Sequence, residues 1–202
     1  MYKILPVDLI READQDCIEK EPIASIDLME RASIGLSEWI TDHFPKDSFV
    51  FHILAGTGNN GGDGLAVARL LHESGYNVRT SIIRFSENSS EDFNVNLERL
   101  QKLIPVEEIQ KEEKLVLNEG EEIIIDAILG SGISRSPEGW LADIIQTIND
   151  SDNPVIAIDM PSGLLADDSS SDHTKNIIKA NITLTLGVHK LALFMPENEQ
   201  FI

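Results

Sequence analysis

A glycine-rich turn between an apolar run and an amphipathic segment most constrains how this chain can fold. The turn covers residues 56–64, Gly-Thr-Gly-Asn-Asn-Gly-Gly-Asp-Gly, and five of its nine residues are glycine. The apolar run before it, residues 49–55, is typical of a buried strand, and the residues after it carry apolar side chains at helical spacing over 64–71. Because so many glycines cost backbone entropy, they favour a turn whose backbone approaches a ligand closely.

The turn also predicts what kind of ligand approaches. A strand, a glycine turn and a helix N-terminus together present free N–H groups, which bind anions such as phosphate. Asn59, Asn60 and Asp63 add side-chain oxygens, which a pure phosphate loop does not require. Oxygens beside N–H groups indicate a phosphate-bearing ligand together with a cation.

Composition bounds the class of protein. The chain has 202 residues, of which 42% are hydrophobic, and this predicts one α/β domain with a real core. Its formal net charge of −19 argues against binding nucleic acid or an anionic membrane through the bulk surface. An anionic ligand therefore needs local help from backbone N–H groups or a bound cation.

Other sequence features favour a cytoplasmic enzyme. Cys17 is the sole cysteine, which excludes an intramolecular disulfide and a zinc cluster of thiolates, and we interpret it as a packing residue. No apolar run approaches the roughly 20 residues of a membrane span, and early acidic residues interrupt any signal-peptide pattern. The five histidines show no ligand spacing, so we interpret them as non-metal residues.

The order of predicted elements is β-α-β-α-β-α-β after two leading helices. This order predicts a Rossmann-like three-layer α/β/α sandwich, with a mostly parallel sheet and helices on both faces. The two leading helices either pack on the sheet or contribute to a dimer contact. Expected helices cover 6–20, 25–43 capped by Ser25, 63–74 ended by Gly75, 89–103 capped by Ser90, and 137–149 begun by Pro137; expected strands cover 49–55, 77–85, 122–127, 154–159, 181–186 and a short 191–195.

Polar residues gather where the predicted strands end. Ligands of open α/β sheets bind beyond the carboxyl ends of the strands. Asp126 and Asp159 lie at two such ends, and Ser162 follows in the turn 159–164. Oxygens of Asn60, Asp126 and Ser162 are the type of ligand that a hard monovalent cation prefers, whereas zinc favours thiolate and imidazole.

Each of these features has a plainer explanation when it is taken alone. Asp126 is equally compatible with capping a turn, and Asp159 with an Asx turn. Lys190 is best interpreted alone as a solvated surface lysine. The pattern Gly56-x-Gly58-x-x-Gly61 matches a dinucleotide fingerprint only weakly. The functional interpretation gains weight because all these residues fall on one edge of the sheet.

Four stretches together resemble the NAD(P)H-hydrate epimerase family, the YjeF N-terminal domain. They are Asn-Asn-Gly-Gly-Asp-Gly at 59–64, Asp-Ala-Ile-Leu-Gly-Ser-Gly at 126–132, Asp-Met-Pro-Ser-Gly at 159–163, and 180–187 with Lys190. The resemblance covers essentially the whole chain, 1–202, as a single domain. It implies interconversion of the R and S epimers of hydrated NADH and NADPH, with no redox cofactor.

The resemblance also implies residue roles. Asn60, Asp126 and Ser162 would bind one potassium ion per subunit, and Asp159 would face the reacting nicotinamide ring as the catalytic acid–base group. A β-carbon at Gly61 or Gly62 is expected to block ligand approach while leaving the fold largely intact. The implied substrate-binding residues are Asn59, Asn60, Gly61, Gly62, Asp63, Gly130, Ser131, Gly132, Ile133, Ser134, Arg135, Ser136 and Asp159.

The resemblance further implies partners. We expect a homodimer, and we expect that an ATP- or ADP-dependent dehydratase domain can follow in the full-length protein, as in many family members. Two departures stand out: Met160 replaces a frequent isoleucine or valine, and 166–176 lacks a glycine-bearing stretch.

Two other functions stay open. An NAD-dependent oxidoreductase would use the Gly56 to Gly61 pattern with Glu87 near the ribose, although no catalytic tyrosine–lysine pair follows. A non-catalytic nucleotide- or protein-binding module would bind without turnover.

Overall fold

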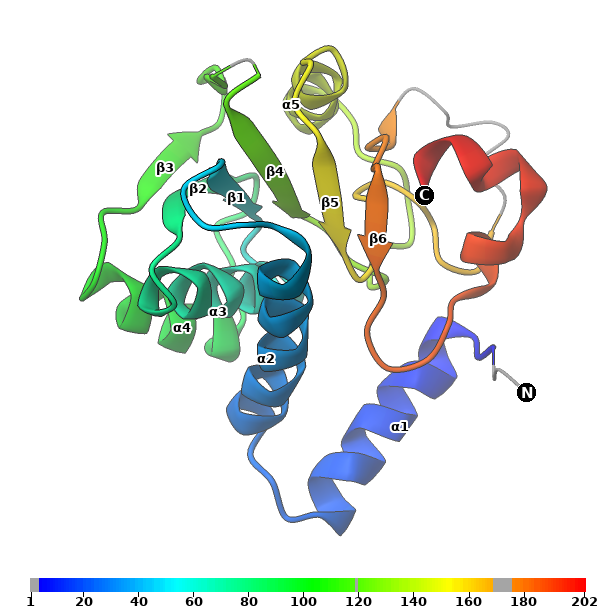
Figure 1. Cartoon of the computed structure of the whole chain (residues 1–202). Coiled ribbons are helices and arrows are strands. Elements are labelled where there is room, and N and C mark those ends of the chain that lie inside the picture. The colour runs from blue at the N-terminus through cyan, green and yellow to red at the C-terminus, as the bar shows by residue number, and fades with distance from the viewer. Residues whose placement is uncertain (1–3, 119, 169–175) are drawn as a thin grey trace.

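The computed structural model describes residues 4–118, 120–168 and 176–202 as a central sheet with surrounding helices (Figure 1). None of the described helices is long and apolar enough to cross a membrane. In chain order the elements are α1 (Val7–Lys20), α2 (Ser25–His43), β1 (Val50–Ala55), α3 (Asn59–Glu73), β2 (Asn77–Arg84), α4 (Glu91–Gln101), β3 (Glu107–Gln110), β4 (Glu122–Ala127), α5 (Trp140–Asn149), β5 (Val155–Ile158), β6 (Ile182–Leu184), and the 3₁₀ helices η2 (Leu191–Phe194) and η3 (Pro196–Phe201).

The sheet has the strand order β3-β2-β1-β4-β5-β6, and every neighbouring pair is parallel. The predicted Rossmann-like fold is therefore confirmed. The chain moves outward from β1 through β2 to β3 and then returns to place β4 beside β1. Leu54 of β1 pairs with Asp126 of β4, so the two strands end together at the point where the winding direction reverses. Ligands of such sheets bind at this switch point.

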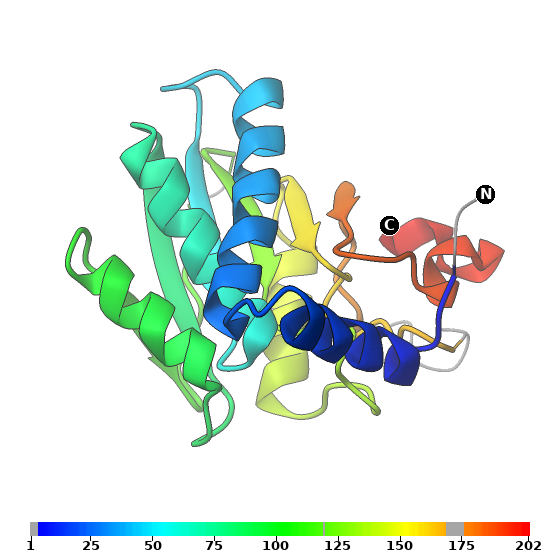
Figure 2. The ribbon, with the colours of Figure 1, turned by 90° about the horizontal axis from the view of Figure 1, so that it is seen from below.

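Both faces of the sheet are covered, which explains why the central strands are apolar without alternation. Phe51, Ile53 and Ala55 of β1 pack with α2, α3 and α4 in one core cluster. Leu54, on the opposite face, packs with Ile144 and its neighbours on α5 in a second cluster. Figure 2 shows α2, α3 and α4 together on one side of the sheet.

Helix α1 stands apart from these layers. Figure 1 places it below the lower ends of β5 and β6, and Figure 2 shows it on the β6 half of the molecule. Among its described residues, Val7 packs against a core cluster and Ile10 is buried, while Leu9 remains 45% exposed. Cys17 is exposed, so its interpretation as a packing residue was wrong. Helix α2, in contrast, packs along α3 and belongs to the same core cluster as the central strands. This agrees with the expectation that a leading helix packs on the sheet.

Several predicted boundaries were wrong for local reasons. Helix α3 begins at Asn59 rather than at residue 63, because the glycines of the turn are themselves helical. Helix α5 begins at Trp140 after Gly139, whose φ of 57° ends the preceding loop, and not at Pro137. Ser25 lies inside the first turn of α2, where its hydroxyl donates to Asp92 instead of capping.

Other local predictions had mixed outcomes. The predicted strand at 191–195 is a 3₁₀ helix, and strand β3, a short polar edge strand, was not predicted. Ser90 does cap α4 by accepting from the backbone N–H of Phe93, and Gly75 follows α3 with a φ of 82°, as predicted. Most of the polar segment 165–176 lies outside the described residues.

A buried polar network pins the amino ends of the central strands together. His52 lies on β1 with its Nδ1 3.0 Å from Glu122 on β4 and its Nε2 2.9 Å from the Ser81 hydroxyl on β2. Arg79 on β2 donates to Glu122 at 3.1 Å. This serine–histidine–glutamate geometry resembles a hydrolytic triad. Because the three residues are at most 1% exposed, it holds strands together rather than meeting a substrate.

Burial of His52 lowers its pKa below the ordinary 6.5, although Glu122 opposes that effect. The folded protein then resists protonation of this ring, whereas the unfolded chain accepts the proton near pH 6.5. Stability is therefore lost as the pH falls through the unfolded pKa. We expect the stability advantage of the wild type over His52→Gln to shrink between pH 7.5 and 5.5, by at most about 1.4 kcal/mol per pH unit. Denaturant unfolding at each pH measures it, and an advantage that does not change with pH would contradict the prediction.

Candidate functional site

The candidate site lies at the carboxyl ends of β1, β4 and β5, where the polar residues singled out from the sequence converge. The organising feature is the turn Leu129–Ser131, which follows β4. Each of its three residues contacts a different candidate group. The Leu129 N–H donates to the Ser162 hydroxyl, Gly130 packs against Asn60, and the Ser131 N–H donates to the Asp159 carboxylate. Residues that are far apart in the chain are thus brought to one place by one short turn.

Asp126 and Ser162 form the buried floor of this site. The Asp126 carboxylate accepts from the backbone N–H of Ser162 at 2.8 Å, from its hydroxyl at 2.5 Å, and from the Ile128 N–H at 3.2 Å. The Leu129 N–H donates to the same Ser162 hydroxyl at 2.8 Å. Asp126 is fully buried, and this burial raises its pKa to about 6 despite the hydrogen bonds. Its charged form therefore gains from any cation bound nearby.

The Asn60 side-chain amide is buried without hydrogen-bond partners among the described residues. This holds for both of its polar atoms, Oδ1 and Nδ2. A β-carbon on Gly130 would lie 3.1 Å from Asn60 Cβ and Cγ, so the backbone of the turn packs tightly against the Asn60 side chain. Buried polar atoms without partners are uncommon, and they indicate a ligand or an ion.

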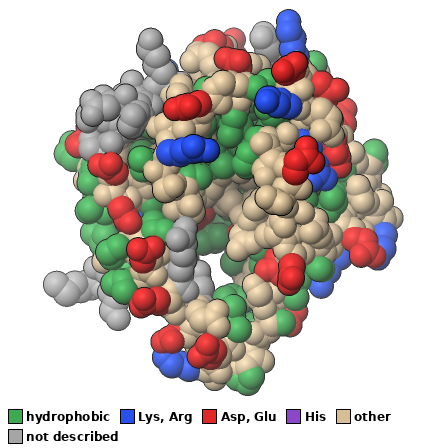
Figure 3. All heavy atoms as spheres, turned by 180° about the vertical axis from the view of Figure 1, so that it is seen from behind, with side chains coloured by type: hydrophobic (Ala, Val, Ile, Leu, Met, Phe, Trp, Pro, Cys, Tyr) green, Lys and Arg blue, Asp and Glu red, His purple; other side chains and the backbone are tan. Residues whose placement is uncertain are grey.

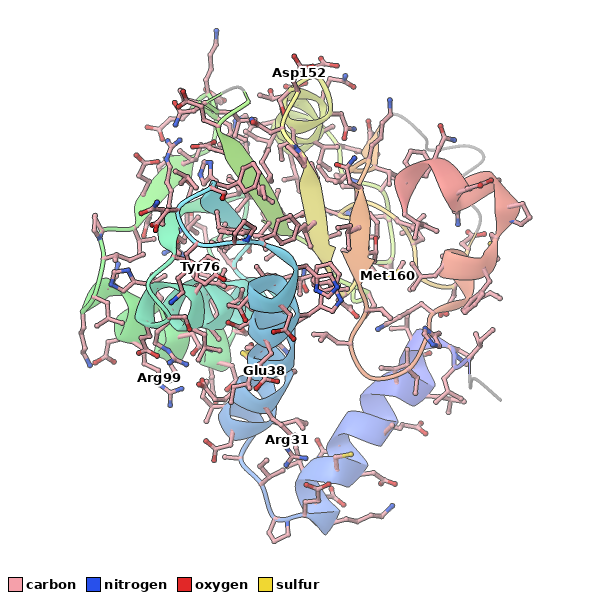
Figure 4. The ribbon with its side chains drawn as sticks, viewed as in Figure 1. Arg31, Glu38, Tyr76, Arg99, Asp152 and Met160 are labelled. Carbon is pink, nitrogen blue, oxygen red and sulfur yellow. The ribbon has the colours of Figure 1, made fainter. Side chains whose placement is uncertain are left out.

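Asp159 is held in a strained and oriented position just after β5. Its φ is 67°, the left-handed region that non-glycine residues rarely adopt. Its Oδ2 accepts from the Ser131 N–H at 3.0 Å, and its Oδ1 accepts from Lys190 Nζ. Such strain is typical of functional positions. Met160, the next residue, is labelled in Figure 4 near the lower ends of β5 and β6.

Lys190 was wrongly interpreted from the sequence as a solvated surface residue. It is 1% exposed and forms an ion pair with Asp159. Spacing alone could not reveal this contact, because the loop between β6 and Lys190 has no regular pattern. The available signal was that an acid at a buried strand end requires a partner.

The glycines of the first turn serve packing as well as ligand access. A β-carbon on Gly61 would lie 1.9 Å from the Gly56 carbonyl oxygen, and one on Gly62 would lie 2.9 Å from Met29 Sδ. The expectation that a side chain leaves the fold largely intact is therefore wrong for Gly61, where the neighbour is backbone, whereas at Gly62 the neighbour is the movable end of the Met29 side chain. Gly58 has open space around it. The N–H groups that begin α3, at Asn59 and its neighbours, have no intrahelical partners, as at any helix start.

A cavity of about 680 Å³ extends from Leu129 along the predicted substrate loop. Arg135 and Lys111 line it as cations, and Phe85 and Trp140 add aromatic surface. The Ser136 hydroxyl in the same loop is buried without a hydrogen-bond partner among the described residues. Sequence reasoning included the loop residues but missed Lys111, Phe85 and Trp140, which come from neighbouring segments. Asn59 is exposed, and Asp63 is buried on α3.

The fold is a Rossmann-like α/β domain, and a cluster of polar residues lies at its switch point. The chain belongs to the YjeF family, because the family model "YjeF-related protein N-terminus" matches residues 25–192. It is 34% identical over 192 residues to the NAD(P)H-hydrate epimerase of Limosilactobacillus fermentum, covering 95% of this chain and 89% of that protein.

Further similarities agree with this assignment. A protein of the same name from Lentilactobacillus buchneri is 36% identical over 206 residues, covering 100% of this chain and 91% of that protein. Among solved structures, yeast ynu0 (YNL200c) superposes with a TM-score of 0.81 at 24% identity, covering 98% of this chain and 86% of that one. The structural likeness supports the fold.

The packing of the first turn leads to a test with a matched control. Gly61→Ala places a β-carbon against the Gly56 carbonyl, whereas Gly58→Ala places one in open space. We expect Gly61→Ala to lower the free energy of unfolding by at least about 2 kcal/mol, and Gly58→Ala by less than about 1 kcal/mol. Urea unfolding of the two variants measures the difference, and equal losses would show that the turn relaxes around an added side chain.

Proposed function

We propose that this protein is an isomerase that interconverts the R and S epimers of hydrated NADH and NADPH, a metabolite-repair reaction. The curated relatives carry the name NAD(P)H-hydrate epimerase over nearly the whole chain. The observation that carries the proposal within the molecule is Asp159, which follows β5 beside the switch point. Its backbone is strained, it is 8% exposed, and its carboxylate is held from two sides.

The chemistry requires a positioned carboxyl group and little else. The hydrate carries a hydroxyl on the carbon beside the ring nitrogen. When that C–O bond breaks, the nitrogen lone pair forms a C=N⁺ bond and the hydroxyl leaves with a proton as water. Water then adds to the opposite face and returns one proton. In its protonated form Asp159 supplies the proton with which the hydroxyl leaves, and it then faces the cationic ring as a carboxylate. It recovers one proton from the water that adds to the opposite face.

The substrate's phosphates fit the remaining features of the site. The N–H groups at the start of α3 and the loop 130–136 present donors, and Arg135 and Lys111 add positive charge along the cavity. Local cations matter here because the surface of the chain is strongly acidic, as Figure 3 shows for one face. This arrangement supports binding of the substrate's phosphates along the substrate loop. Asp159 does not line the cavity, so the reacting ring would have to extend past Ser131, whose N–H donates to Asp159.

A monovalent cation, potassium by family resemblance, fits the donor set of Asn60, Asp126 and Ser162. Asn60 has a buried oxygen without a hydrogen-bond partner in the described part of the chain, Asp126 is a buried acid, and all three ligands are hard oxygens. The ion would stabilise the charged form of Asp126 and hold Asn60 and the Leu129–Ser131 turn together. This role is structural, and the epimerisation steps proceed at Asp159.

The first functional test replaces Asp159. We expect Asp159→Asn to lower the epimerisation rate by about 10²-fold or more, because the amide keeps the shape but cannot transfer the proton. Affinity for the substrate should change much less. The rate is measured on a purified single epimer of hydrated NADH, with the uncatalysed reaction subtracted. Wild-type turnover by Asp159→Asn would show that another group carries the proton.

The same assay separates the alternative functions. Hydride transfer would support an NAD-dependent oxidoreductase, and binding without turnover would support a binding module. The homodimer, a cytoplasmic location and a following dehydratase domain stay predictions. Sedimentation, cell fractionation and the mass of the natural gene product test them in turn.

The cation is tested by stability rather than activity. Since the folded pKa of Asp126 is raised to about 6, its contribution to stability is present at low pH and is lost as the pH rises through that value. Bound potassium offsets the loss. At pH 7.5, potassium at ten times its dissociation constant should raise the unfolding free energy by about 1.4 kcal/mol relative to tetramethylammonium. The gain should shrink at pH 5.

Asp126→Asn provides the control for this measurement. It removes the charge that attracts the ion, so its stability should respond equally to both salts at pH 7.5. A potassium effect of the same size in Asp126→Asn, or none in the wild type, would place the ion elsewhere or exclude it from this site.

A further inference from the structure

Lys190 is a buried cation that none of the functions considered so far requires. It is 1% exposed and ranks among the largest fully buried side chains of the described residues. Lysine is almost never fully buried unless its ammonium is paired. Replacing a buried ion pair by apolar side chains is often neutral or stabilising. Stability alone therefore does not explain why a lysine is buried here.

The contacts of the ammonium group account for all of its donors. Lys190 Nζ donates to Asp159 Oδ1, to the Thr185 hydroxyl at 3.0 Å and to the Leu186 carbonyl at 2.6 Å. An ammonium has three N–H groups, so this set is complete. Lys190 therefore has no donor left for a ligand, and its direct contact with a candidate catalytic group is the one with Asp159.

Asp159 is consequently held at both carboxylate oxygens by different segments. Lys190 holds Oδ1 from the loop after β6, and the Ser131 N–H holds Oδ2 at 3.0 Å from the turn after β4. The backbone is fixed as well, since the Asp159 N–H donates to the Leu184 carbonyl at 2.9 Å. A planar carboxylate held in this way cannot rotate without breaking one of the two contacts.

We propose that Lys190 is the positioning residue for Asp159. By holding Oδ1 while the Ser131 N–H holds Oδ2, it fixes the plane of the carboxylate relative to the substrate ring. This inference rests on the proposed epimerase function. Without Lys190, the carboxylate keeps its buried place but is free to turn about its own axis. Fewer bound substrates then find it aligned, so kcat falls while KM, which depends on the whole dinucleotide, changes little.

The test is a double-mutant cycle on the intact chain. Lys190→Met removes the ammonium at similar volume, and we expect kcat for epimerisation of hydrated NADH to fall at least about tenfold, with KM within about threefold. In the Asp159→Asn background, Lys190→Met should cause no further loss of kcat, because the group it orients no longer acts. Lys190→Gln, which keeps an N–H donor with a shorter reach, should fall between Lys190→Met and the wild type.

A matched control separates positioning from general stability. Arg79→Met also removes a cation from a carboxylate network, at the opposite edge of the same sheet. It should lower the thermal midpoint without changing kcat. If Lys190→Met does not fold, the same cycle is run with Lys190→Gln.

The outcomes are distinguishable. Wild-type kcat in the folded Lys190 variant, or losses that add fully to those of Asp159→Asn, overturn the positioning role. If the wild type itself does not epimerise the hydrate, the proposed function fails and this inference falls with it. Loss of activity in Asp159→Asn but not in the Lys190 variant overturns the positioning role alone.

Discussion

The turn Leu129–Ser131 is the constraint on which the site depends. Parallel strands deliver their carboxyl ends to one edge, but the loops that follow diverge unless something ties them together. Here one turn donates an N–H to the Ser162 hydroxyl and another to the Asp159 carboxylate, and its glycine packs against Asn60. The turn follows β4, the strand beside β1, so it sits at the point where the winding reverses. Any shift of this turn would move all three groups together.

Two buried acids lie at this edge, and their surroundings give them different roles. Asp126 is fully buried and its three described hydrogen bonds come from uncharged donors, so burial raises its pKa to about 6. Asp159 is paired with the protein's own cation, Lys190, and is also slightly exposed. Among the described residues, Asp126 therefore accepts hydrogen bonds from uncharged donors, whereas the charge of Asp159 is balanced by Lys190. Environments that set two carboxyl groups apart in this way are typical of sites that assign them separate tasks.

Much of this arrangement could be predicted from the sequence, because strand ends of a parallel sheet meet regardless of loop detail. The apolar runs, the glycine turn and the acids at 126 and 159 predicted the sheet, its order of layers and the edge that carries the site. What could not be predicted depends on contacts between distant segments. Lys190 follows an irregular loop and its burial has no periodic signal, and β3 is short and polar. The packing role of Gly61 requires knowing that the Gly56 carbonyl lies against it, which spacing does not reveal.

The central claim is that the hydroxyl leaves as water and returns from the other face beside Asp159. Epimerisation of hydrated NADH in water enriched in ¹⁸O tests this most directly, with mass spectrometry of the hydrate at early times. The account predicts that solvent oxygen enters the hydroxyl of the product epimer as fast as epimers interconvert, and that Asp159→Asn slows both together. Interconversion that retains the original oxygen would indicate ring opening and closure instead, and would contradict the account.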